Sequence, residues 1–232
     1  MPVVASAGGP ILGTECHGTA FFLTDDGFFL TAGHVVEECS LVAPAIVVLI
    51  FGGPGYAMMP VQFVTRHPTA DVALGKTLVD DGCLPSPMTL STRRLQQSEA
   101  VAVLGYPRSV AIHSPNSEGK VMSRLRCTPD YFEGQVLDFS PTGVGLSKGA
   151  AYVTDIVAPT PAIKDLGGAS GGPLVASASL HVHGILCSSS EEYAVCTDIA
   201  HALDWEVFEN QNGDIFTIRA MGQRFSGRIR VE

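Results

Sequence analysis

The chain has 232 residues, enough for one large domain or two smaller ones, and it carries a formal net charge of −9 at pH 7. Hydrophobic residues make up 46% of it and charged residues only 16%, a composition that excludes a disordered chain or a coiled coil. Because an acidic chain repels phosphate backbones, nucleic acid is not an expected partner.

The N-terminal residues lack the basic start and the long apolar core of a secretory signal. The longest apolar run, 41–51, contains Pro44 and is shorter than the ~20 residues that a membrane-spanning helix needs. The six cysteines include no Cys-x-x-Cys pair, which favours free thiols over a zinc or redox site. These features predict a cytoplasmic protein with no membrane contact.

Short runs rich in Val, Ile, Phe and Thr, separated by turn residues, predict β-strands. In chain order they cover 19–23, 28–31, 46–51, 61–65, 72–74, 101–104, 135–139, 151–156, 173–176 and 182–186. Between the first two, Asp26 and Gly27 supply the positive φ angles of a tight hairpin turn. Helical periodicity is limited to 199–209, with Asp198 as its N-cap, and to a brief turn after His34.

The lack of long crossover helices disfavours a parallel α/β sheet and favours antiparallel barrels or a sandwich. The polar segment before residue 99 reads as a connector between two groups of strands. We therefore expect an N-terminal β-barrel over 1–85, a connector over 86–98, a C-terminal β-barrel with a helix over 99–209, and a short β-rich tail over 210–232.

Three motifs carry a histidine, an aspartate and a serine in that order. His34 follows the strand 28–31, Asp71 opens the strand 72–74, and Ser170 lies in the glycine-rich turn 167–173. A serine hydroxyl is a weak nucleophile, so it needs a nearby base, and that base needs an orienting acceptor. The glycines allow the N–H groups of Gly168 and Ser170 to point at one spot, where an oxyanion would be stabilised. The set predicts nucleophilic catalysis.

Five segments around these motifs resemble the chymotrypsin-like (trypsin-fold) serine proteases, and within them the bacterial, high-temperature-requirement-like branch. They are 18–22, 30–36, 67–74, 99–107 and 168–174. The resemblance implies two antiparallel six-stranded β-barrels with the catalytic residues His34, Asp71 and Ser170 in the cleft between them. It also implies a serine endopeptidase that cuts polypeptide substrates through an acyl-enzyme and needs no cofactor.

The chain departs from this family at several positions. Ala169 stands where secreted members have an aspartate that pairs with a newly cut N-terminus, so activity should not require removal of a propeptide. Cys187 stands where many relatives keep a serine that supports the aspartate. No trailing peptide-binding module fits into 206–232. By resemblance, the residues near the substrate pocket are Lys164, Asp165, Cys187, Ser189 and Ala194; the two charges leave an acidic or a basic substrate side chain equally open.

Other functions compete with this one. The pattern Gly-x-Ser-x-Gly over 168–172 also fits the nucleophile elbow of α/β-hydrolases, but that fold needs its acid and histidine after the serine. An esterase could use the same site. A protease-fold scaffold, or a protease gated by a regulatory protein partner, is suggested by Ala169 and by the long loop 157–169. The complete triad counts against a pure scaffold.

Two further patterns have ordinary structural explanations. His181 and His183 would share one face of a strand, as in some metal sites, but no third ligand is evident, so we expect two half-exposed residues and no metal. Cys16 and Cys39 lie near a disulfide of secreted relatives whose second partner is here replaced by Val35. We expect both thiols to be free.

Overall fold

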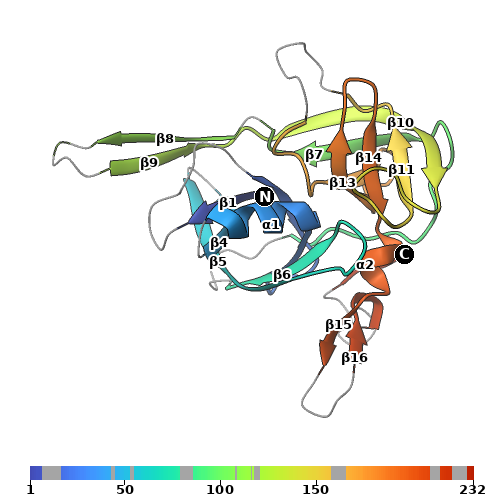
Figure 1. Ribbon diagram of the computed structural model, residues 1–232, viewed down its shortest axis with the longest axis horizontal. Coiled ribbons are helices and arrows are strands. Elements are labelled where there is room, and N and C mark those ends of the chain that lie inside the picture. The colour runs from blue at the N-terminus through green and yellow to red at the C-terminus, as the bar shows by residue number, and fades with distance from the viewer. Residues whose placement is uncertain are drawn as a thin grey trace.

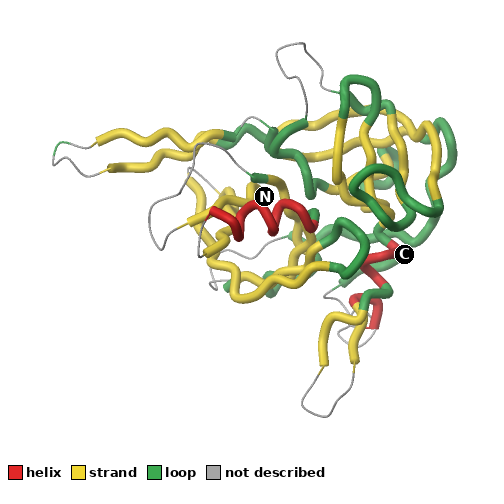
Figure 2. Tube along the Cα trace, viewed as in Figure 1, coloured by secondary structure: helices red, strands yellow, loops and turns green. Residues whose placement is uncertain are grey.

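The computed structural model describes residues 1–6, 17–42, 45–52, 55–78, 86–107, 109–115, 117, 121–157, 166–209, 215–220 and 229–232. Most of these residues lie in β-strands, as predicted, and two six-stranded sheets make up the body of the molecule (Figure 1). Figure 2 shows how little helix accompanies them. Among the described residues, no helix is both long and apolar enough to span a bilayer.

The first sheet is a closed antiparallel barrel from the N-terminal third of the chain. Going round it, the strands are β1 (Pro2–Ser6), β2 (Gly18–Phe22), β3 (Phe28–Thr31), β6 (Ala73–Thr77), β5 (Gly55–Arg66) and β4 (Ala45–Gly52). Apolar side chains on both faces of its strands are buried, and Phe29, Leu30 and Leu74 belong to one hydrophobic core cluster. Each strand predicted in this part overlaps an observed one, while β1 was not predicted.

The second sheet is built from residues after the connector. Its strands are ordered β10 (Asp130–Ser140), β11 (Ala151–Thr154), β14 (Ala194–Asp198), β13 (Val182–Ser189), β12 (Pro173–Ala176) and β7 (Ala100–Gly105). β7 also pairs antiparallel with β10, from Gly105 opposite Asp130 to Ala100 opposite Gln135. Every strand of this sheet therefore has a hydrogen-bonded neighbour on both sides.

The predicted hairpin between β2 and β3 is present, but its turn is wider than a two-residue one. The N–H of Leu23 donates to the carbonyl of Phe28 at 2.8 Å, which leaves Thr24 to Gly27 as the loop. Only Gly27, with φ 101°, adopts a left-handed backbone. The hydroxyl of Thr24 accepts the N–H of Phe28 at 3.0 Å. This side-chain hydrogen bond stabilises the wider loop, which needs no second residue with a positive φ.

The two helices differ from the sequence prediction in opposite ways. Where a brief turn was expected after His34, α1 (Gly33–Val42) runs for 10 residues, because Val35, Val36 and Cys39 form one buried stripe on it. This helix packs against β1, β4 and β5.

The helix predicted over 199–209 is wrong in extent. α2 spans only Ala200–Leu203, and β15 (Glu206–Glu209) follows it and pairs with β16 (Ile215–Thr217). Trp205 and Val207 face the core while Glu206 is exposed, and this alternation suits a strand rather than a helix. The N-cap position is Ile199, which makes no side-chain cap bond, while Asp198, predicted as the N-cap, lies one residue earlier and accepts the N–H of Ala200 at 3.0 Å.

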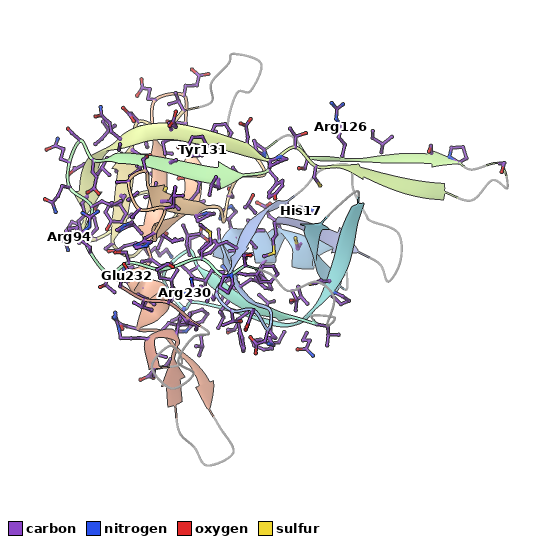
Figure 3. The ribbon with its side chains drawn as sticks, turned by 180° about the vertical axis from the view of Figure 1, so that it is seen from behind. His17, Arg94, Arg126, Tyr131, Arg230 and Glu232 are labelled. Carbon is purple, nitrogen blue, oxygen red and sulfur yellow. The ribbon has the colours of Figure 1, made fainter. Side chains whose placement is uncertain are left out.

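The connector, residues 86–98, is held in place by backbone pairing with other parts of the chain. Leu90, which is fully buried, forms parallel bridges with Val182 of β13 and with Val231 near the C-terminus. The backbone carbonyl of Leu90 also accepts the N–H of Glu232, which lies beside the second sheet together with Arg230 (Figure 3). The end of the chain thus fixes the connector between the two sheets.

A two-stranded hairpin that the sequence did not predict joins β7 to β10. It consists of β8 (Val110–Pro115) and β9 (Val121–Arg126) and extends away from both six-stranded sheets (Figure 1). Ile112 is about half exposed, and the side chain of Arg126 projects into solvent (Figure 3).

Candidate active site

His34 and Asp71 lie just after β3 and just before β6, two neighbouring strands of the first barrel, and form a hydrogen-bonded pair. His34 is the second residue of α1, and Asp71 lies in the turn before β6. One oxygen of Asp71 accepts the backbone N–H of His34 at 2.8 Å, and the other contacts His34 Nδ1 at 2.7 Å. Because an ionised carboxylate only accepts, Nδ1 carries the proton and Nε2 is the acceptor of the neutral ring. Such a ring can remove a proton from a hydroxyl.

The surroundings of His34 favour its protonated form. Burial lowers the pKa of His34, but the hydrogen bond and the negative charge of Asp71 outweigh it, and Glu38 adds to them. The positive charge of Arg66 opposes this effect. The net result is a pKa above the ordinary value of 6.5. Because its pKa is raised, the neutral imidazole of His34 is a stronger base than that of an exposed histidine.

This shift gives a prediction for pH dependence. His34 must be neutral to act as a base. For any reaction in which this histidine is the base, we therefore expect kcat/KM to fall on acidification with a midpoint above pH 6.5. Glu38→Gln should move the midpoint to lower pH and Arg66→Gln to higher pH, because both side chains are exposed and their charges act on His34 in opposite directions. Steady-state rates over a pH series would measure this. Shifts in the same direction for both variants would contradict it.

The same raised pKa has the opposite consequence for stability. Proton binding at His34 favours the folded state, so this contribution is complete below the unfolded-state pKa of about 6.5. It is lost as the pH rises through the folded-state pKa. The neutral form of His34, which can act as a base, therefore contributes less to stability than the protonated form.

His67, which the sequence analysis did not single out, holds the loop that carries Asp71. Its Nδ1 accepts the N–H groups of Thr69 at 3.2 Å and Ala70 at 2.9 Å. Burial, helped by the nearby His201, lowers the pKa of His67, in keeping with a ring nitrogen that accepts. The ring of His67 packs against Trp205 with centroids 5.2 Å apart. In the sequence, the position of His67 four residues before Asp71 was the only indication of this role.

Ser170 follows a tight turn whose geometry depends on glycine. The N–H of Ala169 donates to the carbonyl of Leu166 at 2.8 Å, and Gly168 has φ 85°. This is the pattern of a type II turn, which requires a left-handed residue at its third position. After the serine, Gly171 also has φ 85° and donates its N–H to the carbonyl of Leu186 at 2.7 Å. Ser170 is therefore fixed between two left-handed glycines.

Gly171 also lies too close to the first barrel to accept a side chain. A Cβ atom there would be 2.1 Å from the carbonyl oxygen of Thr19 and 2.3 Å from Thr31 Oγ1. We expect Gly171→Ala to lower the free energy of unfolding by about 4 kcal/mol, the sum of backbone strain and overpacking. Gly145→Ala is the control, because Gly145 has φ 60° but nothing nearer than 3.9 Å.

The control variant should lose only the strain component, about 1–2 kcal/mol. Urea denaturation of both variants would test the difference. Equal losses would show that the contact between Gly171 and the first barrel does not matter.

The turn that carries Ser170 is docked on the segments that lead to His34. The N–H of Thr19 donates to the carbonyl of Ser170 at 2.7 Å. A Cβ atom on Gly18 would lie 2.5 Å from Val35, the residue after the histidine, and 2.8 Å from the Ser170 carbonyl. The structure thus places the backbone of the Ser170 turn against the segments on either side of His34, and among the described residues no hydrogen bond joins Ser170 Oγ to the ring.

The pocket residues implied by the resemblance occupy different environments. Ser189 is partly exposed, and its hydroxyl accepts the N–H of Leu166 at 3.2 Å. Ala194 is fully buried. Lys164 and Asp165 lie outside the described residues.

Cys187 lies in β13 and is fully buried, so its side chain does not line an open pocket. Its Sγ lies 3.1 Å from Thr197 Oγ1, and the thiol donates to the carbonyl of Val195 at 3.3 Å. Burial raises the pKa of Cys187 to about 12, and the charge of Asp71 acts in the same direction. The thiol therefore stays protonated, and among the described contacts it forms no hydrogen bond to Asp71.

The remaining candidate residues, where the structure describes them, make ordinary structural contacts. His183 is fully buried, not half exposed as expected, because its Nδ1 pairs with the carbonyl of Arg93 at 2.8 Å. His181 contacts Glu232 at 3.3 Å. Within the described ranges, no group of three His, Cys, Asp or Glu side chains could hold a metal. Cys39 is fully buried, and Cys16 lies outside those ranges.

Comparison with solved structures yields proteins of the same fold. The MamO protease domain of Magnetospirillum magneticum is 19% identical, with a TM-score of 0.59 over 85% of this chain and 91% of that one. Deg5 is 18% identical, with a TM-score of 0.57 over 81% of each chain. The Rv3671c protease of M. tuberculosis, in an inactive form, has a TM-score of 0.52 at 18% identity over 79% of each chain.

Sequence comparison adds two findings. The uncharacterized protein y4bJ of Sinorhizobium fredii is 34% identical over 97 residues, which is 42% of this chain but only 14% of that protein. The family model for a trypsin-like peptidase domain matches residues 18–185, a range that contains His34, Asp71 and Ser170. The chain therefore belongs to the trypsin-like peptidase family.

Proposed function

We propose that the chain is a serine endopeptidase in which Ser170 is the nucleophile, His34 the general base and Asp71 the residue that orients the base. The observation that carries this proposal is the His34–Asp71 pair together with the docking of the Ser170 turn on the segment just before that histidine. Membership of the peptidase family supports it.

The geometry suits acyl transfer. Ser170 Oγ attacks the substrate carbonyl carbon while His34 Nε2 accepts the hydroxyl proton. The imidazolium then returns this proton to the leaving amine, and Asp71 stabilises the positive ring through its contact with Nδ1. In the second half, water attacks the acyl-enzyme ester while His34 accepts a proton from it, and the histidine then gives this proton to the leaving Ser170 Oγ as the carboxylic acid product is released. The peptide bond is broken, and the enzyme is regenerated without a cofactor.

The turn before Ser170 suits an oxyanion site. The N–H of Ala169 closes the turn on Leu166. The N–H groups on either side of it, those of Gly168 and Ser170, are the pair that we propose to bind the oxyanion.

The residue in front of the nucleophile supports activity without propeptide removal. Ala169 is fully buried and packs closely against Gly105. A Cβ atom added to Gly105 would lie only 2.7 Å from the Cβ of Ala169. An apolar residue in this position needs no charged N-terminus as a partner. Within the family we propose the high-temperature-requirement-like branch, on the motifs around Gly18, His34 and Asp71.

Digestion of a diverse peptide mixture tests the proposed function. We expect internal cleavage products, identified by mass spectrometry, that are absent when Ser170→Ala protein is used. A matched set of esters distinguishes an esterase, which would hydrolyse the esters and leave every peptide intact. Peptide cleavage that survives in the Ser170→Ala protein would refute the assignment.

A further inference from the structure

Thr19 lies where three distant segments of the chain meet. These are β2, which contains Thr19 itself, the end of β7 at Gly105 and Tyr106, and the turn that carries Ser170. The side chain is 2% exposed, so its polar atoms are separated from water. A buried hydroxyl needs partners within the protein.

Thr19 uses all of its polar groups at this junction. Its hydroxyl donates to the carbonyl of Gly168 at 2.8 Å and accepts the N–H of Tyr106 at 3.1 Å. Its own N–H donates to the carbonyl of Ser170 at 2.7 Å, and its carbonyl accepts the hydroxyl of Thr31 at 2.7 Å. Only the two bonds of the hydroxyl depend on the side chain.

The bond to Gly168 fixes a particular peptide unit. The peptide between Gly168 and Ala169 has its carbonyl held by Thr19 and its N–H held by the carbonyl of Leu166. The Gly168 N–H is joined to that plane through only the two dihedral angles of Gly168, of which φ is 85°, so fixing the plane at both ends restricts the direction of this N–H. Without the hydroxyl, the plane would be held at one end only.

We propose that Thr19 is a positioning residue for the oxyanion site: its hydroxyl bridges Tyr106 and Gly168 and thereby aims the Gly168 N–H at the developing oxyanion. This inference rests on the proposed protease function and adds to it a residue of the first barrel that controls a backbone group of the second half of the chain. Tight packing at the junction supports it, because a Cβ atom on Gly105 would lie 3.4 Å from Thr19 Oγ1.

Thr19→Val tests the proposal, because valine keeps the shape of threonine but lacks the hydroxyl. We expect kcat to fall by about 10²-fold, with little change in KM, since misplacing a group by about 1 Å has an effect of this size. The affinity for a peptide boronic acid, whose tetrahedral adduct uses the oxyanion site, should fall in parallel. The acid limb of the pH profile should not move, because the His34–Asp71 pair is untouched.

Two control variants separate positioning from general damage. Thr19→Ser restores the hydroxyl and should recover most of the lost kcat. Thr77→Val removes another buried hydroxyl that donates to a carbonyl, that of Gly27 at 3.2 Å, far along the first barrel from the serine turn. It should lose stability but not kcat. Equal activity of Thr19→Val and Thr77→Val, or no recovery in Thr19→Ser, would overturn the proposal.

Amide hydrogen exchange distinguishes failure of this inference from failure of the proposed function. We expect the N–H of Tyr106 to exchange faster in Thr19→Val than in Thr77→Val, whether or not a substrate is cleaved. If the wild-type protein has no Ser170-dependent activity, the proposed function fails, and the exchange rates still report on the bridge. Unchanged exchange at Tyr106 would show that the hydroxyl does not hold this junction.

Discussion

Ser170→Ala is expected to lower kcat/KM by about 10⁶-fold, because it removes the only group proposed to form the acyl bond. The variant should fold normally, since the structural contact of this residue is made by its backbone carbonyl with Thr19. A fluorophosphonate probe should label the wild-type protein at this serine and leave the variant unlabelled. Ser179→Ala, at an exposed serine, is the control and should be labelled like the wild type.

A double variant that lacks both Ser170 and His34 gives a stricter test. Residues that act as one catalytic unit do not have additive effects, so the double variant should be little worse than Ser170→Ala alone. Independent, multiplicative losses would mean that the histidine does not serve the serine. Initial rates on a cleaved peptide identified in the mixture experiment would provide the comparison.

Asp71→Asn is expected to lower kcat by about 10⁴-fold while the fold is retained. One oxygen of Asp71 accepts the backbone N–H of His34, and the amide oxygen of asparagine can keep this bond. Its NH₂ group then faces His34 Nδ1 and donates to it, which places the ring proton on Nε2. A ring in that tautomer cannot accept the proton of Ser170.

NMR detection of the imidazole nitrogens would show the tautomer directly, and stopped assays would give kcat. Asp25→Asn, at an exposed loop position, is the matched control and should change neither. An active Asp71→Asn protein with the proton still on Nδ1 would contradict the proposed role of the carboxylate.

The strands and the site motifs were predictable because each depends on short stretches of sequence. The short, continuous apolar runs of β3 and β12 reflect burial on both faces of these strands, and the predicted bounds of the two strands match the observed ones. His34 and Asp71 were found because each lies at the end of such a strand. Their pairing followed from chemistry.

Contacts between distant segments were not predictable. Nothing near Thr19 in the sequence indicates a bond to Gly168, which is 149 residues away. The direction of Cys187 was hidden by a register shift between Leu186 and Ser188 in β13, which breaks the strict alternation of faces. The pattern from Leu203 to Val207 fits a helix or a strand, and only the buried Trp205 decides between them.

The junction at Thr19 also bears on how the protein folds. Each six-stranded sheet can form from its own part of the chain, whereas the serine turn takes its final shape only against β2 of the first barrel. Closing so long a loop is slow, because its entropic cost precedes the contacts that reward it. For the proposed protease, we therefore expect activity to appear only after both sheets have formed and docked, so that a half-folded chain does not cleave neighbouring proteins.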